Sequence, residues 1–131
     1  MLGDAIATNQ TLQTLHLGLT GMTDEGLLLL LKPALAKASA LSLKELNLSA
    51  NHLSKAGVEV LANVLTKHSY AITHLDLSSN RDIREDSGKT LFDAIKHAST
   101  ILQLNLKGTQ VSNETASAIR HVLMTNGRPR A

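Results

Sequence analysis

Four residues, His16, Glu45, His74 and Asp76, have side chains that could carry out acid-base or metal chemistry. A carboxylate beside an imidazole can move a proton, and two histidines with an aspartate can hold a metal ion. Such sites need a pocket that excludes water and a second layer of residues that orients the ligands. The sequence instead predicts an open sheet surface at these positions, because all four lie in one short repeated motif. We therefore expect no enzyme activity, no metal site and no cofactor.

The repeated motif has the pattern L-x-x-L-x-L, with isoleucine also found at its first position. It starts at residues 12, 43, 72 and 101, so successive starts are 31, 29 and 29 residues apart. Its apolar positions are Leu12, Leu15, Leu17, Leu43, Leu46, Leu48, Ile72, Leu75, Leu77, Ile101, Leu104 and Leu106. Four copies at this spacing predict four equivalent structural units. Residues 1–11 align with the second half of a unit, so we expect them to form a partial repeat.

Each motif predicts a short β-strand with one buried and one exposed face. Side chains alternate between the faces of a strand, so the two leucines of L-x-L point inward together and their neighbours point outward. The outward positions are Thr14, His16, Gly18, Glu45, Asn47, Ser49, His74, Asp76, Ser78, Gln103, Asn105 and Lys107. This surface lacks the Trp, Tyr and Arg that are typical of binding hot spots. It is interpreted either as a face that binds through hydrogen bonds and charge, or as an ordinary solvated sheet face.

A polar residue follows each strand where the chain must turn. It stands eight residues after each motif start, as Thr20, Asn51, Asn80 and Thr109. Backbone groups in such a turn need partners, and an asparagine or threonine side chain can bond the amides and carbonyls of the neighbouring unit. We expect these four residues to stack as a structural ladder.

A helix with one buried stripe is predicted after each turn. The evidence is a pair of aliphatic or alanine residues four positions apart in each copy: Leu30 and Ala34, Leu61 and Leu65, Leu91 and Ile95, and Ile119 and Leu123. Pro33 lies inside the first of these helices and predicts a kink or a break. Strands and helices that alternate at this short period must place the strands parallel. We predict an α/β fold in one domain over residues 1–131, a curved right-handed βα superhelix with a parallel inner sheet and outer helices.

These motifs resemble leucine-rich repeats over nearly the whole chain, and the repeat length with a full helix is similar to the ribonuclease-inhibitor-like subclass. Members of that subclass include ribonuclease inhibitor, the sensing regions of NOD-like receptors, Ran GTPase-activating protein, tropomodulin and the CARMIL scaffolds. The resemblance implies a solenoid, and because residues 1–11 align with the second half of a repeat we expect the chain to be part of a longer array. Because these proteins share a fold and not one activity, the resemblance does not fix the function. We predict a protein-interaction scaffold that binds a partner protein, whose identity the sequence does not give, through its concave sheet face.

The third repeat departs from the pattern in the loop after its strand. It has one extra residue between Asn80 and Ile83, inside a charged stretch. We expect this loop to bulge from the edge of the solenoid and to offer Arg81, Asp82 and Arg84 to a partner, although a tolerated surface insertion is the alternative. A second hypothesis follows from the likeness to Ran GTPase-activating protein, namely that a loop arginine regulates a nucleotide-binding enzyme. No specific motif of that family matches these residues.

Composition excludes several other functions. The formal net charge is +2, with thirteen basic and eleven acidic residues scattered along the chain, and Tyr70 and Phe92 are the only aromatic residues, so a nucleic-acid partner is not expected. The longest apolar run, Leu27 to Leu31, is far too short to span a membrane. The sequence has no cysteine, which favours a reducing, cytoplasmic location. No polar cap is evident at either end of the array, so end-to-end self-association is a further expectation.

Overall fold

The structure, a computed structural model, describes residues 13–36, 43–67, 72–98 and 101–126. Within these described residues, four short strands alternate with four helices. The strands are β1 (Thr14–His16), β2 (Glu45–Asn47), β3 (His74–Asp76) and β4 (Gln103–Asn105). The helices are α2 (Asp24–Ala36), α3 (Lys55–Lys67), α4 (Glu85–Lys96) and α5 (Asn113–Asn126). The expected partial repeat over residues 1–11 lies outside the described residues.

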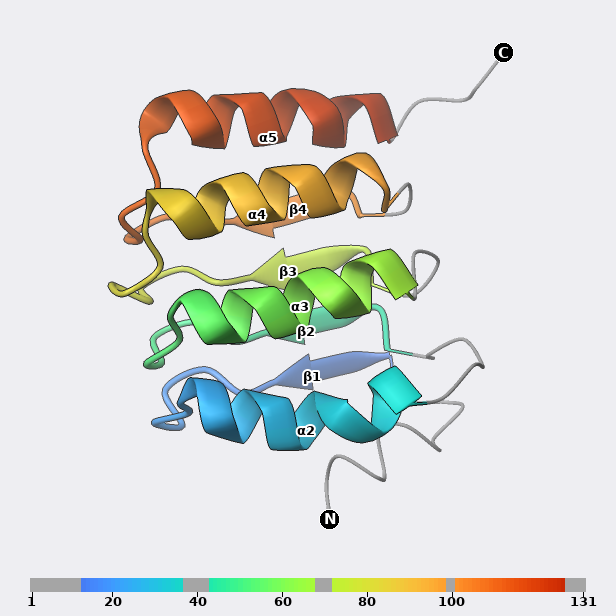
Figure 1. The fold of residues 1–131 in the computed structure, drawn as a ribbon, viewed down its shortest axis with the longest axis vertical. Helices are drawn as coiled ribbons and strands as arrows, with labels where there is room; N and C mark the ends of the chain where they lie inside the picture. The colour runs from blue at the N-terminus through green and yellow to red at the C-terminus, as the bar shows by residue number, and fades with distance from the viewer. Residues whose placement is uncertain (1–12, 37–42, 68–71, 99–100, 127–131) are drawn as a thin grey trace.

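The strands form one parallel sheet in chain order, β1-β2-β3-β4. The middle residue of each motif is in register with its equivalents, so Leu15, Leu46, Leu75 and Leu104 form a row across the sheet. The four helices stack in the same order as a second layer over the strands (Figure 1). The predicted α/β solenoid with an inner parallel sheet and outer helices is therefore confirmed.

The core fills the space between the two layers. The leucines at the fourth and sixth motif positions of the second and third repeats are fully buried, and so is the helical stripe of Leu61, Leu65, Leu91 and Ile95. The equivalent strand residues of the outer repeats, such as Leu15 and Leu104, are only partly buried. This difference follows from the architecture, because the strand residues of a solenoid repeat are covered by the repeats on both sides.

Helix α2 continues through Pro33 and ends at Ala36. The structure therefore has one continuous helix here. Of the two expected outcomes, a kink or a break, the break does not occur. The proline ring removes a single backbone donor, and the loss falls near the end of the helix, where few further hydrogen bonds depend on it.

One backbone feature recurs in every repeat and was not predicted. The residue seven positions after each motif start has a positive φ angle: 57° at Leu19, 53° at Ala50, 59° at Ser79 and 78° at Gly108. The turn after each strand thus enters the left-handed region at this position, which costs about 1 to 2 kcal/mol for a residue other than glycine. Helices of the described residues are also all too short or too polar to cross a membrane.

Candidate protein-binding surface

The sheet surface turned away from the helices, here called the inner face, carries two parallel rows of polar side chains. The strand register places Thr14, Glu45, His74 and Gln103 in one row and His16, Asn47, Asp76 and Asn105 in the next. Each row crosses all four repeats. Eight of the twelve outward positions thus lie side by side, and the other four, Gly18, Ser49, Ser78 and Lys107, each lie two residues beyond the second row.

A shallow hollow of about 330 Å³ lies at the middle of the inner face. Its lining consists of His16, Glu45, Leu46, Asn47, His74, Leu75, Asp76, Gln103 and Asn105. Polar side chains from all four strands therefore line this depression. A hollow of this size is large enough for one or two side chains of a partner protein.

The imidazole and carboxylate groups of the inner face contact each other only loosely. Nδ1 of His74 lies 3.8 Å from Oε1 of Glu45, and both side chains are more than a third exposed. The Thr14 hydroxyl donates a 3.0 Å hydrogen bond to the other carboxylate oxygen of Glu45. Among the described residues, no group of three His, Cys, Asp or Glu side chains is placed to hold a metal ion. An open site with this loose geometry does not favour acid-base catalysis, which requires close contacts in a sheltered pocket.

The second row of the inner face is held in a fixed orientation by the chain that follows each strand. Oδ1 of Asp76 accepts hydrogen bonds from the amide and the hydroxyl of Ser78 at 2.9 and 2.6 Å. Asn47 makes the same pair of bonds with Ser49 at 2.9 and 2.7 Å. Within the described chain the other carboxylate oxygen of Asp76 and the amide nitrogen of Asn47 have no hydrogen-bond partner. These two polar groups are therefore oriented and available to a ligand.

The loop between β3 and α4, residues 81–84, is anchored although it contains the extra residue. Ile83 is completely buried, and its carbonyl accepts a 2.7 Å hydrogen bond from the amide of Gln110. The Gln110 side chain donates to the carbonyl of Arg81, also at 2.7 Å. Arg81, Asp82 and Arg84 are exposed. The backbone of this loop is thus fixed while its three charged side chains face solvent.

Asn51 bridges the first two repeats at the turn after β2. Its amide nitrogen donates to the carbonyls of Leu17 and Leu48 at 2.9 and 3.0 Å. Its oxygen accepts from the backbone amides of Thr20 and Met22 at 3.1 and 3.0 Å. One buried side chain therefore satisfies backbone groups on two neighbouring turns.

Asn80 has the same function one repeat later and is fully buried. Its oxygen accepts from the amide of Leu53 at 3.1 Å, and its nitrogen donates to the carbonyls of Leu48 and Leu77, both at 3.0 Å. Thr109 differs, because its hydroxyl bonds the carbonyl of Leu106 in its own turn. The ladder residues that connect repeats through their own side chains are thus mainly the two asparagines.

Two contacts between neighbouring helices were not found by sequence reasoning. The carboxylate of Glu85, the first residue of α4, accepts bonds from the hydroxyl and amide of Ser112 at 2.6 and 3.3 Å. The carboxylate of Asp24, the first residue of α2, contacts Ser54 in the same way, with the Ser54 amide at 2.8 Å. We call this contact a clasp. Its signal was an acid at the start of one helix and a serine just before the next, but only two of the repeat pairs carry it.

The pKa of Glu85 lies below its ordinary value of 4.5. The main cause is the hydrogen bond from the Ser112 side chain, followed by the bond from the Thr115 side chain, and both stabilise the ionised carboxylate. Burial acts in the opposite direction, and the positive charge of Lys89 adds a small lowering. The clasp therefore favours a charged Glu85.

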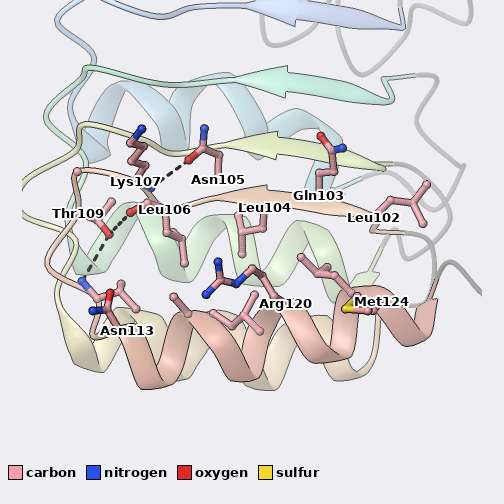
Figure 2. Close-up of a pocket in the computed structure, with 15 residues that line it drawn as sticks. Leu102, Gln103, Leu104, Asn105, Leu106, Lys107, Thr109, Asn113, Arg120 and Met124 are labelled. Carbon is pink, nitrogen blue, oxygen red and sulfur yellow. Dashed lines mark hydrogen bonds between the residues drawn. The ribbon is translucent and has the colours of Figure 1, made fainter.

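The open end of the fourth repeat forms a second, larger hollow of about 800 Å³ (Figure 2). It lies between β4 and α5, where Arg120 extends from the helix across the opening. Leu104 of β4 and Leu106 just after it line this hollow, together with Met124, which is 63% exposed. This is core surface that a neighbouring unit covers in the inner repeats.

Comparison with known proteins agrees with the repeat structure. The profile of the Leucine Rich repeat family matches residues 8–31 and 40–62. The chain is 39% identical over 103 residues to NACHT, LRR and PYD domains-containing protein 14 of Mus musculus. The matched region covers 78% of this chain but only 10% of that protein. The chain therefore spans about a tenth of the length of this relative.

Two solved structures share the fold. Leiomodin-1 Actin-Binding Site 2 superposes with a TM-score of 0.80, covering 95% of this chain and 69% of that one at 18% identity. The C-terminal domain of tropomodulin from Caenorhabditis elegans gives a TM-score of 0.69, covering 95% and 72% at 20% identity. The four in-register strands, the stacked helices, the profile match and the relative together establish that this chain belongs to the leucine-rich repeat family.

Proposed function

We propose that this chain is a protein-interaction module that binds a partner protein through the hollow of its inner face. The observation that carries the proposal is that Asp76 and Asn47, which line that hollow, each hold an oriented polar group with no hydrogen-bond partner within the described chain. A partner side chain that donates to Asp76 would meet an acceptor whose position is already fixed. Preorganisation of this kind lowers the entropy cost of binding.

The comparisons support a binding function without naming the partner. The leiomodin structure is described as an actin-binding site, and the mouse relative combines leucine-rich repeats with other domains. Likeness at 18% identity concerns the fold alone, so actin is not carried over to this chain. We infer that the inner face binds a protein, with no enzymatic reaction of its own, because its polar groups are open to water.

We assign the repeats to the ribonuclease-inhibitor-like subclass. The support is the spacing of the motif starts at 29 to 31 residues and the full helices of 12 to 14 residues in every repeat. The alternative in which a loop arginine activates a GTPase gains no support from the comparisons.

The binding proposal is tested by affinity capture from cell lysate with the immobilised chain. The inner-face variant combines His74→Ala and Asp76→Ala. A matched control combines Glu59→Ala and Asn63→Ala, which are exposed on the outer side of α3. We expect a partner that the wild type and the control retain equally and that the inner-face variant retains about tenfold less. Equal retention by all three proteins would exclude the inner face as the binding site.

A second interaction is favoured by the hollow at the open end of the fourth repeat. We propose that this surface, with Leu102 and Met124 exposed, associates with another copy of the chain. Exposed apolar patches of this kind commonly mark interaction sites. Light scattering over a concentration series should show a mass that rises with concentration for the wild type and stays monomeric for Leu102→Lys with Met124→Lys. A wild-type mass that does not change with concentration would contradict self-association.

A further inference from the structure

Arg84 occupies a position where the other repeats place a small hydroxyl residue. It is the N-cap of α4, with extended backbone angles and no side-chain capping bond. The equivalent residues before α2, α3 and α5 are Thr23, Ser54 and Ser112. The Ser112 hydroxyl accepts a bond from the amide of Thr115 at 3.2 Å and so caps α5. A guanidinium group only donates hydrogen bonds, so Arg84 cannot cap the helix in this way.

The arginine at this position also means that the second and third repeats are not joined by a clasp. The position of the clasp carboxylate is held by Lys55, and the position of the clasp serine by Arg84. Two cations therefore stand where the other pairs have an acid and a serine. Lys55 is partly compensated by Asp86 at 3.8 Å, an exposed ion pair of small value. Arg84 also lies at the positive end of the helix dipole, where a cation is unfavourable.

The side chains of Arg81 and Arg84 have no ion-pair partner among the described residues. Asp82 stands between them in the sequence but forms no ion pair with either within the described chain. Their backbone is nevertheless fixed by the buried Ile83 and by the two hydrogen bonds from Gln110. The third repeat thus lacks a helix cap and a clasp to the second repeat, and its two arginines are held at defined positions in solvent. Residues that break local rules without an internal gain are expected at functional sites.

We propose that Arg81 and Arg84 form a docking point for a carboxylate-rich segment of a partner protein. The guanidinium group is planar and donates two parallel hydrogen bonds to a carboxylate, and its charge does not depend on pH in the physiological range. The loop begins three residues after Ser78, directly beyond the buried Asn80, where the chain leaves the inner face. A partner seated on the inner face would therefore reach the arginines with an adjoining acidic segment. The inference rests on the proposed binding function and names the chemistry of the partner.

Titration of the ¹⁵N-labelled chain with an acetylated hexaglutamate peptide at low salt tests the inference. We expect amide shifts confined to residues 81–86 and their neighbours, and affinity that falls as salt screens the charges. The variant Arg81→Gln with Arg84→Gln should bind about tenfold more weakly. The matched control, Lys32→Gln with Lys96→Gln, removes the same charge from exposed positions on α2 and at the far end of α4 and should bind like the wild type. Absence of localised shifts, or equal weakening in the control, would overturn the inference.

The single variant Arg84→Ser separates a binding role from a structural one. It restores a capping residue, so the Tm should rise by about 3 °C while affinity for hexaglutamate falls. A variant that is both more stable and weaker in binding is not expected if Arg84 serves the fold. The inner-face variant Asp76→Ala should leave hexaglutamate binding unchanged, so failure of the docking point and failure of the inner-face proposal give different results. Unchanged peptide affinity in Arg84→Ser would contradict the assignment of Arg84.

Discussion

The hydroxyl of Ser112 donates a 2.6 Å hydrogen bond to the carboxylate of Glu85 and so joins the start of α4 to the start of α5. The Asp24 and Ser54 clasp joins α2 to α3 in the same way. Because consecutive repeats of a solenoid contact only their neighbours, stability depends on such interfaces, one pair at a time. The interface between the second and third repeats lacks the clasp, because Lys55 and Arg84 hold the equivalent positions.

The Glu85 clasp predicts a specific dependence of stability on pH. The pKa of Glu85 is lowered in the folded chain, so the unfolded chain binds a proton more readily, and the stabilisation is present above pH 4.5 and is lost as the pH falls through the folded value. The variant Glu85→Gln lacks this titration. Urea unfolding followed by circular dichroism should therefore show a larger loss of stability from pH 7 to pH 3.5 for the wild type. Parallel pH profiles for the two proteins would contradict a lowered pKa.

Asn80 should be among the most sensitive polar residues of the described chain. The variant Asn80→Ala leaves the amide of Leu53 and the carbonyl of Leu77 without their partner in a fully buried site, while the carbonyl of Leu48 keeps its bond from Asn51. Each unsatisfied buried group costs about 1 to 3 kcal/mol, although some relaxation is expected, so the free energy of unfolding should fall by about 3 kcal/mol. Denaturant titration at pH 7 measures this change.

Thr109→Val is the control for the Asn80 prediction. The Thr109 hydroxyl donates to a carbonyl of its own turn, in a partly exposed position of the outer repeat. Water can replace that bond, so we expect a loss of only about 0.5 to 1 kcal/mol. An equal effect of the two substitutions would contradict the claim that the asparagine, and not the turn position itself, connects the repeats.

The spacing of the motif predicted both the positions of the strands and the order in which they pair. An L-x-x-L-x-L copy buries Leu46 and Leu75 by the alternation of side chains in a strand, and repetition at a constant length places equivalent residues in register. The inner-face rows follow from that register. They did not require knowledge of any particular contact.

The left-handed turn position and the clasp could not be predicted from the sequence. Leu19, Ala50, Ser79 and Gly108 share a positive φ although three of them are not glycine, so the residue types gave no signal. The conformation is imposed by the hydrogen bonds between stacked turns, as when the amide of Ser79 donates to the carbonyl of Lys107. The clasp depends on a side-chain contact across 27 residues in the case of Glu85 and Ser112. An acid at the start of one helix and a serine before the next do not by themselves show that the two side chains meet.

The positive-φ position of each turn predicts that a change to glycine raises stability and that a change from glycine lowers it. Leu19 is 84% exposed with a φ of 57°, so Leu19→Gly relieves backbone strain and loses little packing. Stability should rise by about 0.5 to 1 kcal/mol, since the greater chain entropy of glycine in the unfolded state offsets part of the gain. Gly108→Leu should lower it by about 1 to 2 kcal/mol, because φ is 78° and the new Cβ would lie 3.2 Å from the amide nitrogen of Ser79. Thermal unfolding of both variants checks the two signs, and a shift in the same direction would contradict the strain argument.

The interface between the second and third repeats should become more stable when it is given the residues of its neighbours. The double variant Lys55→Asp with Arg84→Ser rebuilds a carboxylate at the start of α3 and a serine before α4, as in the clasps of Asp24 and Glu85. We expect a gain of about 1 to 2 kcal/mol in the free energy of unfolding, although the exposed ion pair of Lys55 with Asp86 is lost. The two single variants should sum to less than the double variant by about 0.5 kcal/mol, because the clasp needs both partners. Strict additivity in this double-mutant cycle would show that the new carboxylate and serine do not meet. A more stable chain that no longer binds hexaglutamate would show directly that the natural residues at this interface are kept for binding at the expense of stability.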